Sequence, residues 1–289
     1  MKLEKIKTRV QDVQKGEQVS LRSIPSGYDF ETHSLFEAAL LLESELTKKS
    51  PHEAASKLLL QQVILKSTLV RFKDANLGKL TALLDHVYQS ESYKGDWETF
   101  YKIANCFISK VLMRRKGVSI TLGIILIKFL EANGFEAYGV CFSRDLIIKV
   151  YCENEFIYID PFSGEIQNWD QLEAKMRGYL GNHVKLNIDM LNVDSHEMVI
   201  KNLISVMKVA YLQARQFELA LICCDILLRI DPDNAFERRE RGCLFQELNC
   251  VALAVKDFQI FIDRYPNDPT VSILEKQIKK MRFNQPVIH

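Results

Sequence analysis

The C-terminal third of the chain repeats itself at an offset of 34 residues. Three pairs of similar residues recur at this offset: Ala220 and Ala254, Pro232 and Pro266, Tyr211 and Phe245. Lys208 and Gly242 are a fourth pair at the same offset. A small alanine lets two helices approach closely, an aromatic ring fills the gap between them, and proline ends the second helix of a pair. The repeat therefore predicts stacked helical hairpins.

A period of this length with these residue types is typical of tetratricopeptide repeats, although helical hairpins can share it by coincidence. It predicts an all-α tetratricopeptide-repeat domain over residues 195–289, with repeats at about 201–234 and 235–268 and a capping helix at 270–282. Because each repeat buries a face on its neighbour, we expect the capping helix to cover one end of the pair and the preceding domain to cover the other.

The preceding sequence predicts a different fold class. Residues 1–30 are polar and contain the turn signal "IPSGYDF", which indicates an N-terminal arm. From Thr32 to Gly134 apolar residues recur at helical spacing, and the period then changes to two in "FEAYGVCF", "DLIIKVYC" and "EFIYIDPF". The last two runs meet at Glu153-Asn154, a hairpin signal, and "NWDQLEAKMRGYLG" is helical again. Residues 31–190 are therefore predicted to form an α+β domain, a helical layer with a small antiparallel sheet.

Composition limits the partners and the compartment. The formal net charge is +1, with 47% hydrophobic and 26% charged residues, so no overall field favours nucleic acid or an anionic membrane. The longest apolar stretch, "ITLGIILIKFL", is too short to span a bilayer and contains Lys128. The N-terminus has no apolar segment of the kind found in secretory signals. These features predict a cytoplasmic protein with no membrane or nucleic-acid partner.

The seven cysteines are consistent with a reducing compartment. No Cys-x-x-Cys pair occurs, and the six histidines are scattered singly. Metal sites in proteins usually show closely spaced ligands of these types. We therefore expect no metal ion and no cofactor.

Residues 105–164 carry a resemblance to a known family. The stretches "NCFISKVLMRRKGVSITLGIILIKFLEANGFEAYGV", "FSRDLIIKV" and "IYIDPFSGE" resemble the SirB-type bacterial family. In that family a transglutaminase-like, papain-related core precedes tetratricopeptide repeats, and the resemblance covers residues from about 32 to 270. The resemblance implies this fold. It does not imply an activity, because the function of the family is poorly defined, so whether the first domain is catalytic depends on its residues.

Transglutaminase-like folds use a Cys-His-Asp arrangement, with the cysteine at the start of the buried helix and the other two residues on adjacent strands. The resemblance implies that Ser119, or alternatively Thr121, stands in the cysteine position of this chain. It places Asp145 in the histidine position and Asp160 in the aspartate position. Two of the three side chains are therefore unsuited to the chemistry, which predicts a degenerate, non-catalytic domain.

Two alternatives remain open for this domain. The first is an active cysteine hydrolase or acyltransferase with a non-standard nucleophile, for which Cys106 and Cys141 are the candidates. For Asp145 and Asp160 an ion pair with Arg114, Arg115 or Arg144 is an alternative to any catalytic role.

The repeats predict a peptide-binding groove. With Lys201 as the first repeat position, eight residues face inward: Asn202, Ser205, Val209, Leu212, Phe236, Arg239, Cys243 and Gln246. Asparagine and arginine beside apolar residues suit an extended peptide or a C-terminal carboxylate. Alternatively, Leu212 and Phe236 pack on the first domain or on the next helix. The predicted function is that of a non-catalytic interaction or regulatory protein with an unidentified protein or peptide partner.

Overall fold

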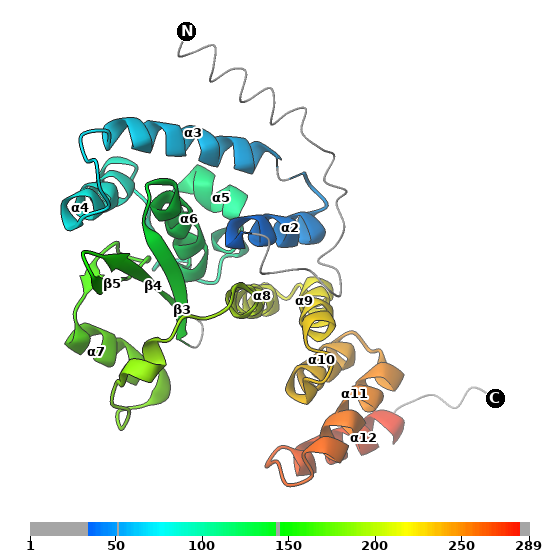
Figure 1. Ribbon diagram of the computed structural model, residues 1–289. Helices are drawn as coiled ribbons and strands as arrows, with labels where there is room; N and C mark the ends of the chain where they lie inside the picture. Colours follow the sequence, from blue (N-terminus) through cyan, green and yellow to red (C-terminus); the bar gives the residue numbers. More distant parts are fainter. Residues whose placement is uncertain (1–33, 51, 143–144, 284–289) are drawn as a thin grey trace. The chain divides into compact units, whose positions relative to one another are not determined.

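The computed structural model describes residues 34–50, 52–142 and 145–283 (Figure 1). The chain divides into two compact units, residues 1–203 and residues 204–289. The boundary lies inside helix α8 (His196–Gln213). The predicted N-terminal arm at residues 1–30 and the predicted ion-pair partner Arg144 lie outside the described residues.

Helices make up most of the first unit. They are α2 (Leu35–Thr47), α3 (His52–Thr68), α4 (Leu77–Asp85), α5 (Ile108–Arg114), α6 (Ser119–Ala132) and α7 (Trp169–Leu180), with short helical turns at His86–Ser90, Ile103–Asn105 and Ile188–Leu191. Helix α6 is buried on nearly every side, as its apolar sequence predicts. Within the described ranges, no helix is both long and apolar enough to cross a membrane.

Four strands form an antiparallel sheet in the order β3 (Glu136–Phe142), β4 (Asp145–Cys152), β5 (Glu155–Ile159) and β6 (Ile166–Gln167). Glu153 and Asn154 join β4 to β5 with φ of 51° and 68°, the left-handed conformation that a two-residue hairpin requires. A separate pair, β1 (Lys94–Gly95) and β2 (Lys116–Gly117), is parallel. The predicted α+β class, a helical layer with a small antiparallel sheet, is confirmed.

The sheet lies between α6 and α7 (Figure 1). Successive side chains of a strand point to opposite faces, so Leu146 and Ile148 of β4 face α6. A Cβ added to Gly123 of α6 would lie only 2.6 Å from Leu146 Cδ2, which shows how closely this helix approaches the strand. On the other face, Ile147 packs in one apolar cluster with Leu172 of α7. Asp145 belongs to this second face.

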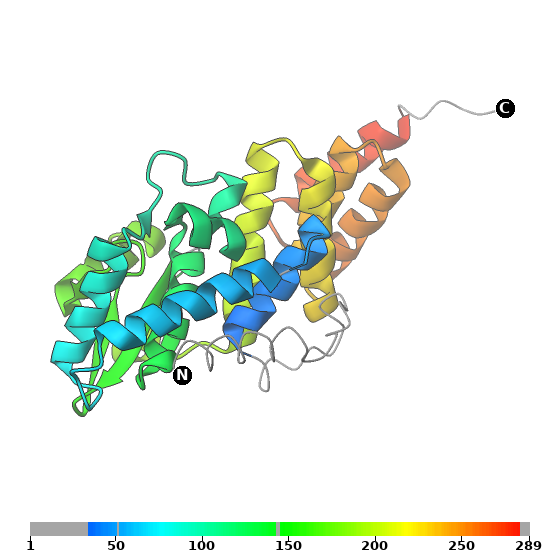
Figure 2. The ribbon, with the colours of Figure 1, turned by 90° about the horizontal axis from the view of Figure 1, so that it is seen from above.

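The second unit consists of helical hairpins followed by a last helix. It contains the end of α8, then α9 (Phe217–Ile230), α10 (Ala235–Glu247), α11 (Val251–Arg264) and α12 (Val271–Phe283). Helices α9 to α12 lie side by side in sequence order (Figures 1 and 2). The repeated alanines Ala220 and Ala254 are both fully buried, as close helix packing requires. The predicted all-α repeat architecture is therefore confirmed.

Candidate functional site

A cavity of about 380 Å³ opens beside one end of the sheet. It is lined by Trp97, Phe100, Asp145, Asp160, Phe162, Ala174, Lys175, Gly178 and Tyr179. These residues come from three places: the loop after β1, the strand ends of β4 and β5, and helix α7. Because β4 and β5 are antiparallel, the start of β4 and the turn after β5 lie at the same end of the sheet.

Lys175 lies between the two aspartates. Its Nζ is 2.8 Å from Asp145 Oδ2 and 2.7 Å from Asp160 Oδ2. Tyr179, one helical turn further along α7, donates its hydroxyl to Asp145 Oδ2 at 3.1 Å. The side chains of Lys175, Asp145 and Asp160 are only 17%, 9% and 16% exposed, so little water screens these charges.

The charges of this cluster support one another. Burial lowers the pKa of Lys175, but the charges of Asp145 and Asp160 outweigh it, and the net effect raises the pKa above its ordinary value. Burial and the charge of Asp145 raise the pKa of Tyr179 as well. At neutral pH the lysine is therefore an ammonium and the tyrosine a neutral donor.

Each aspartate also binds the backbone with its other oxygen. Asp145 Oδ1 accepts a hydrogen bond of 3.0 Å from the amide of Leu146. Asp160 Oδ1 accepts one of 2.8 Å from the amide of Phe162, an interaction typical of aspartate at the start of a turn. Both carboxylates are thus held at both oxygens.

The two candidates for the nucleophile position have different surroundings. The hydroxyl of Thr121 lies 2.7 Å from the carbonyl oxygen of Asn105, which accepts its hydrogen bond. The hydroxyl of Ser119 is buried and has no hydrogen-bond partner in the described part of the chain. Ser119 shares a face of α6 with Gly123, which contacts the face of β4 opposite to Asp145. The structure brings Asp145 and Asp160 together, but neither Ser119 nor Thr121 lines their cavity.

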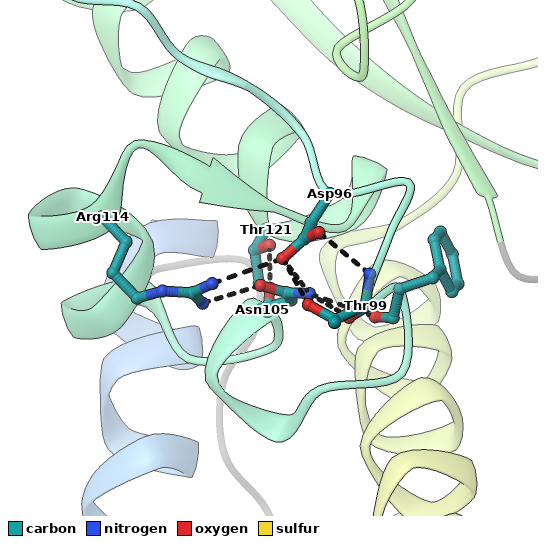
Figure 3. Close-up of polar contacts among 6 residues, drawn as sticks. Asp96, Thr99, Asn105, Arg114 and Thr121 are labelled. Atoms are coloured by element: carbon teal, nitrogen blue, oxygen red, sulfur yellow. Dashed lines mark hydrogen bonds and ion pairs between the residues drawn. The ribbon is translucent and has the colours of Figure 1, made fainter.

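A buried polar network holds the loop that carries Trp97 and Phe100 (Figure 3). Asp96 accepts hydrogen bonds from the amide and hydroxyl of Thr99, from Asn105 Nδ2 at 3.1 Å and from Arg114 at 3.3 Å. Burial raises the pKa of Asp96, but these hydrogen bonds outweigh it and lower the pKa to about 2. The network is satisfied internally, so it holds the loop from which the two aromatic side chains project.

The arginines take partners other than Asp145 and Asp160. Arg114 pairs with Asp96, and Arg115 pairs with Glu91. The partner that the aspartates do have, Lys175, was missed by sequence reasoning. The spacing of Lys175 and Tyr179 in "AKMRGY" indicates a common helix face, but no sequence pattern tells which end of the sheet that face meets.

The candidate cysteines are poorly placed for nucleophilic chemistry. Cys106 is fully buried. Burial, followed by the charge of Asp194, raises the pKa of Cys141 to about 12, so its reactive thiolate form is scarce at neutral pH. Among the described residues that line the cavity there is no cysteine and no histidine.

The predicted groove residues are divided between the two units. The side chain of Asn202 interacts with the thiol of Cys141 on β3, within the first unit. The other seven belong to the second unit: Ser205, Val209, Leu212, Phe236, Arg239, Cys243 and Gln246. Leu212 and Phe236 are 37% and 43% exposed.

Arg239 is already engaged inside its own unit. Its guanidinium lies 4.8 Å from the centroid of the Phe261 ring and donates to Thr270 Oγ1 at 3.2 Å. Lys208 of α8 is buried and pairs with Glu237 of α10 at 2.7 Å. Among the seven predicted residues of this unit, Leu212, Phe236 and Cys243 are exposed, and the others are half-buried.

Both parts of the chain match known protein families. Residues 42–205 match the transglutaminase-like superfamily, and residues 207–279 match the tetratricopeptide repeat. A UPF0162 protein of Vibrio cholerae is 32% identical over 264 residues, which cover 90% of this chain and 96% of that protein. Protein SirB1 of Salmonella typhimurium is 30% identical over 225 residues, which cover 75% of this chain and 80% of that protein. The UPF0162 protein YchA of Escherichia coli K12 is 26% identical over 204 residues, which cover 68% of this chain and 76% of that protein. No solved structure matches.

Proposed function

Since this chain belongs to the transglutaminase-like superfamily and to the bacterial family of SirB1 and the UPF0162 proteins, we propose that it is a non-catalytic interaction protein of the bacterial cytoplasm. In this proposal a degenerate transglutaminase-like domain is joined to repeats that bind a protein or peptide. The partner is neither nucleic acid nor membrane.

The observation that carries the proposal is the engagement of Asp145 by Lys175 and Tyr179. The histidine of an active family member must accept a proton from the nucleophile near neutral pH. Both oxygens of Asp145 are already engaged, Oδ2 by Lys175 and Tyr179 and Oδ1 by the amide of Leu146, so neither is free to contact a nucleophile. Asp145 also faces α7, whereas Ser119 lies on the face of α6 that contacts the other side of β4.

The second unit supports the interaction half of the proposal. Tetratricopeptide repeats generally bind extended segments of other proteins. Leu212 and Phe236 expose apolar surface on α8 and α10, the first helices of the two hairpins. An apolar contact of this kind suits a peptide with hydrophobic side chains.

The non-catalytic half is tested with active-site probes. The purified chain is treated with a fluorophosphonate, which labels activated serines, and with iodoacetamide, which labels activated thiols. We expect no rapid labelling, and we expect Ser119→Ala, Cys106→Ser and Cys141→Ser to leave any trace hydrolysis of peptide amides unchanged. Loss of a measurable activity in one of these variants would instead support the alternative, an active hydrolase or acyltransferase.

The interaction half is tested with a peptide library. Peptides selected on the full chain should lose about tenfold or more in affinity for Leu212→Ala and Phe236→Ala, since exposed apolar anchors dominate such contacts. Ile222→Ala is the matched control, because Ile222 is a comparably exposed apolar residue on the second helix of a hairpin. Equal affinity of all three variants would exclude the predicted groove. Thermal unfolding of each variant separates lost binding from lost folding.

A further inference from the structure

We infer that the cavity beside Lys175 binds a guanidinium group, carried either by an arginine side chain of the partner or by a small organic molecule. The inference deepens the proposed function and rests on it, because it names the chemistry that a partner presents to the first unit. Charge, aromatic lining and preorganisation of the cavity support it independently.

The described side chains that line the cavity carry an excess of negative charge. Two carboxylates, Asp145 and Asp160, share the single ammonium of Lys175, and Tyr179 is a neutral donor. A largely buried charge without a counter-charge is unfavourable. A cationic ligand would offset it, whereas an anionic ligand would add a further negative charge. Charge complementarity therefore selects a cation.

Aromatic rings form the other wall of the cavity. Trp97 is 82% exposed, unusual for so large an apolar side chain, and meets Phe162 edge to face with ring centroids 4.4 Å apart. Phe100 lies 6.1 Å from Phe162 in a tilted arrangement. Aromatic faces attract cations, and a planar, weakly hydrated guanidinium stacks on them better than an ammonium does.

The cavity has the size and the rigidity of a small-ligand site. Its volume of about 380 Å³ lies in the range of about 300–1,000 Å³ that is usual for such sites. The loop with Trp97 and Phe100 is held by the network of Asp96, Asn105 and Arg114. Because the loop is already ordered, binding does not have to supply the free energy to order it.

The test uses three probes that differ in the head group alone: butylguanidine, butylamine and the neutral butylurea. Titration calorimetry on the full chain should give the tightest binding for butylguanidine and at least about tenfold weaker binding for butylurea. Equal affinities for butylguanidine and butylurea would overturn the charge argument. Equal affinities for butylguanidine and butylamine would overturn the assignment of a guanidinium.

Variants locate the site. Asp160→Asn removes the excess charge but keeps an oxygen for the amide of Phe162, and we expect about tenfold weaker binding of butylguanidine. Asp170→Asn is the matched control, since Asp170 is an exposed acid of α7 outside the cavity lining. Trp97→Ala should also weaken binding, and its 82% exposure makes unfolding no concern. Unchanged binding in both Asp160→Asn and Trp97→Ala would overturn the assignment to this cavity.

A fourth probe distinguishes the two sources of the guanidinium. Tighter binding of acetyl-arginine methylamide than of butylguanidine supports a partner side chain, because the added backbone groups then contribute. Tighter binding of butylguanidine supports a small molecule. If no guanidinium probe binds while library peptides still bind in a manner that depends on Leu212 and Phe236, the inference fails and the proposed function stands.

Discussion

At the scale of single residues, Lys175 determines the chemistry of the cavity. It converts two neighbouring carboxylates, which would otherwise repel each other, into an ordered cluster with one excess negative charge. Asp145 thereby has a structural role, as the partner of Lys175 and Tyr179, in the place where the family resemblance implies a histidine. The nearby carboxylate of Asp96 has a different role, because hydrogen bonds satisfy it inside a loop.

Replacing Lys175 with methionine should destabilise the chain by about 3 kcal/mol, since it leaves two carboxylates close together without their cation. The free energy of unfolding from urea titration measures this loss. The control is Lys128→Met, which breaks a pair with Glu131 whose side chains are 31% and 42% exposed, and it should cost no more than about 1 kcal/mol. Equal losses in the two variants would contradict the role given to the cluster.

Asp96 makes the stability of the chain depend on pH at the acid end. In the folded chain the pKa of Asp96 is about 2, below the ordinary value of 3.8. The stabilisation that its carboxylate contributes is therefore fully present above pH 3.8 and is lost as the pH falls toward 2. We expect the urea midpoint of the parent chain to fall more steeply between about pH 4 and pH 2 than that of Asp96→Asn. Parallel curves for the two proteins would show that the carboxylate is not held as described.

At the scale of elements, the close approach of α6 to β4 sets the geometry of the sheet end. Gly123 allows this approach, since Leu146 fills the space where a larger residue would place its Cβ. The contact directs Leu146 toward α6 and therefore turns Asp145, its neighbour on the strand, toward α7. The arrangement of the cavity follows from this packing.

Two helical glycines of the first unit should respond oppositely to alanine. Gly123→Ala should destabilise the unit by about 1–3 kcal/mol, because the new Cβ would lie 2.6 Å from Leu146 Cδ2 and force the helix and strand apart. Gly178→Ala, on α7, should stabilise it by about 0.5–1 kcal/mol, because nothing beyond its own neighbours and helix backbone lies within 4 Å of the new Cβ and alanine favours helix. Urea unfolding compares the two. A stabilising Gly123→Ala would contradict the packing of α6.

At the scale of the whole molecule, the chain combines two units with separate cores. The first core surrounds α6 and the sheet, and the second joins Ala254, Phe258 and Phe261 of α11 to Leu274 of α12. The seven cysteines are distributed over both units and are all free thiols. Their exposure provides a simple measure of the native fold.

The folded chain should expose two thiols to an aromatic disulfide reagent at neutral pH. Cys243 and Cys250 are exposed, whereas Cys106, Cys152, Cys223 and Cys224 are buried and Cys141 is half-buried with a pKa raised to about 12. Absorbance of the released thiolate should therefore correspond to two groups in buffer and seven in concentrated urea. Fast reaction of Cys106 or Cys141 in buffer would contradict this description and support a nucleophilic cysteine.

The sequence by itself determined the two-part architecture, because helix, strand and repeat periods are properties of neighbouring residues along the chain. Its resemblance to the SirB-type family is confirmed by the matches to SirB1 and the UPF0162 proteins. The resemblance also identified Asp145 and Asp160 as candidate site residues. Only the tertiary structure decided what surrounds these aspartates, since Lys175 pairs with both from α7 and Trp97 lines the same cavity from the loop after β1. A periodic pattern identifies which face of an element is buried, but the partner of that face depends on how the whole chain packs.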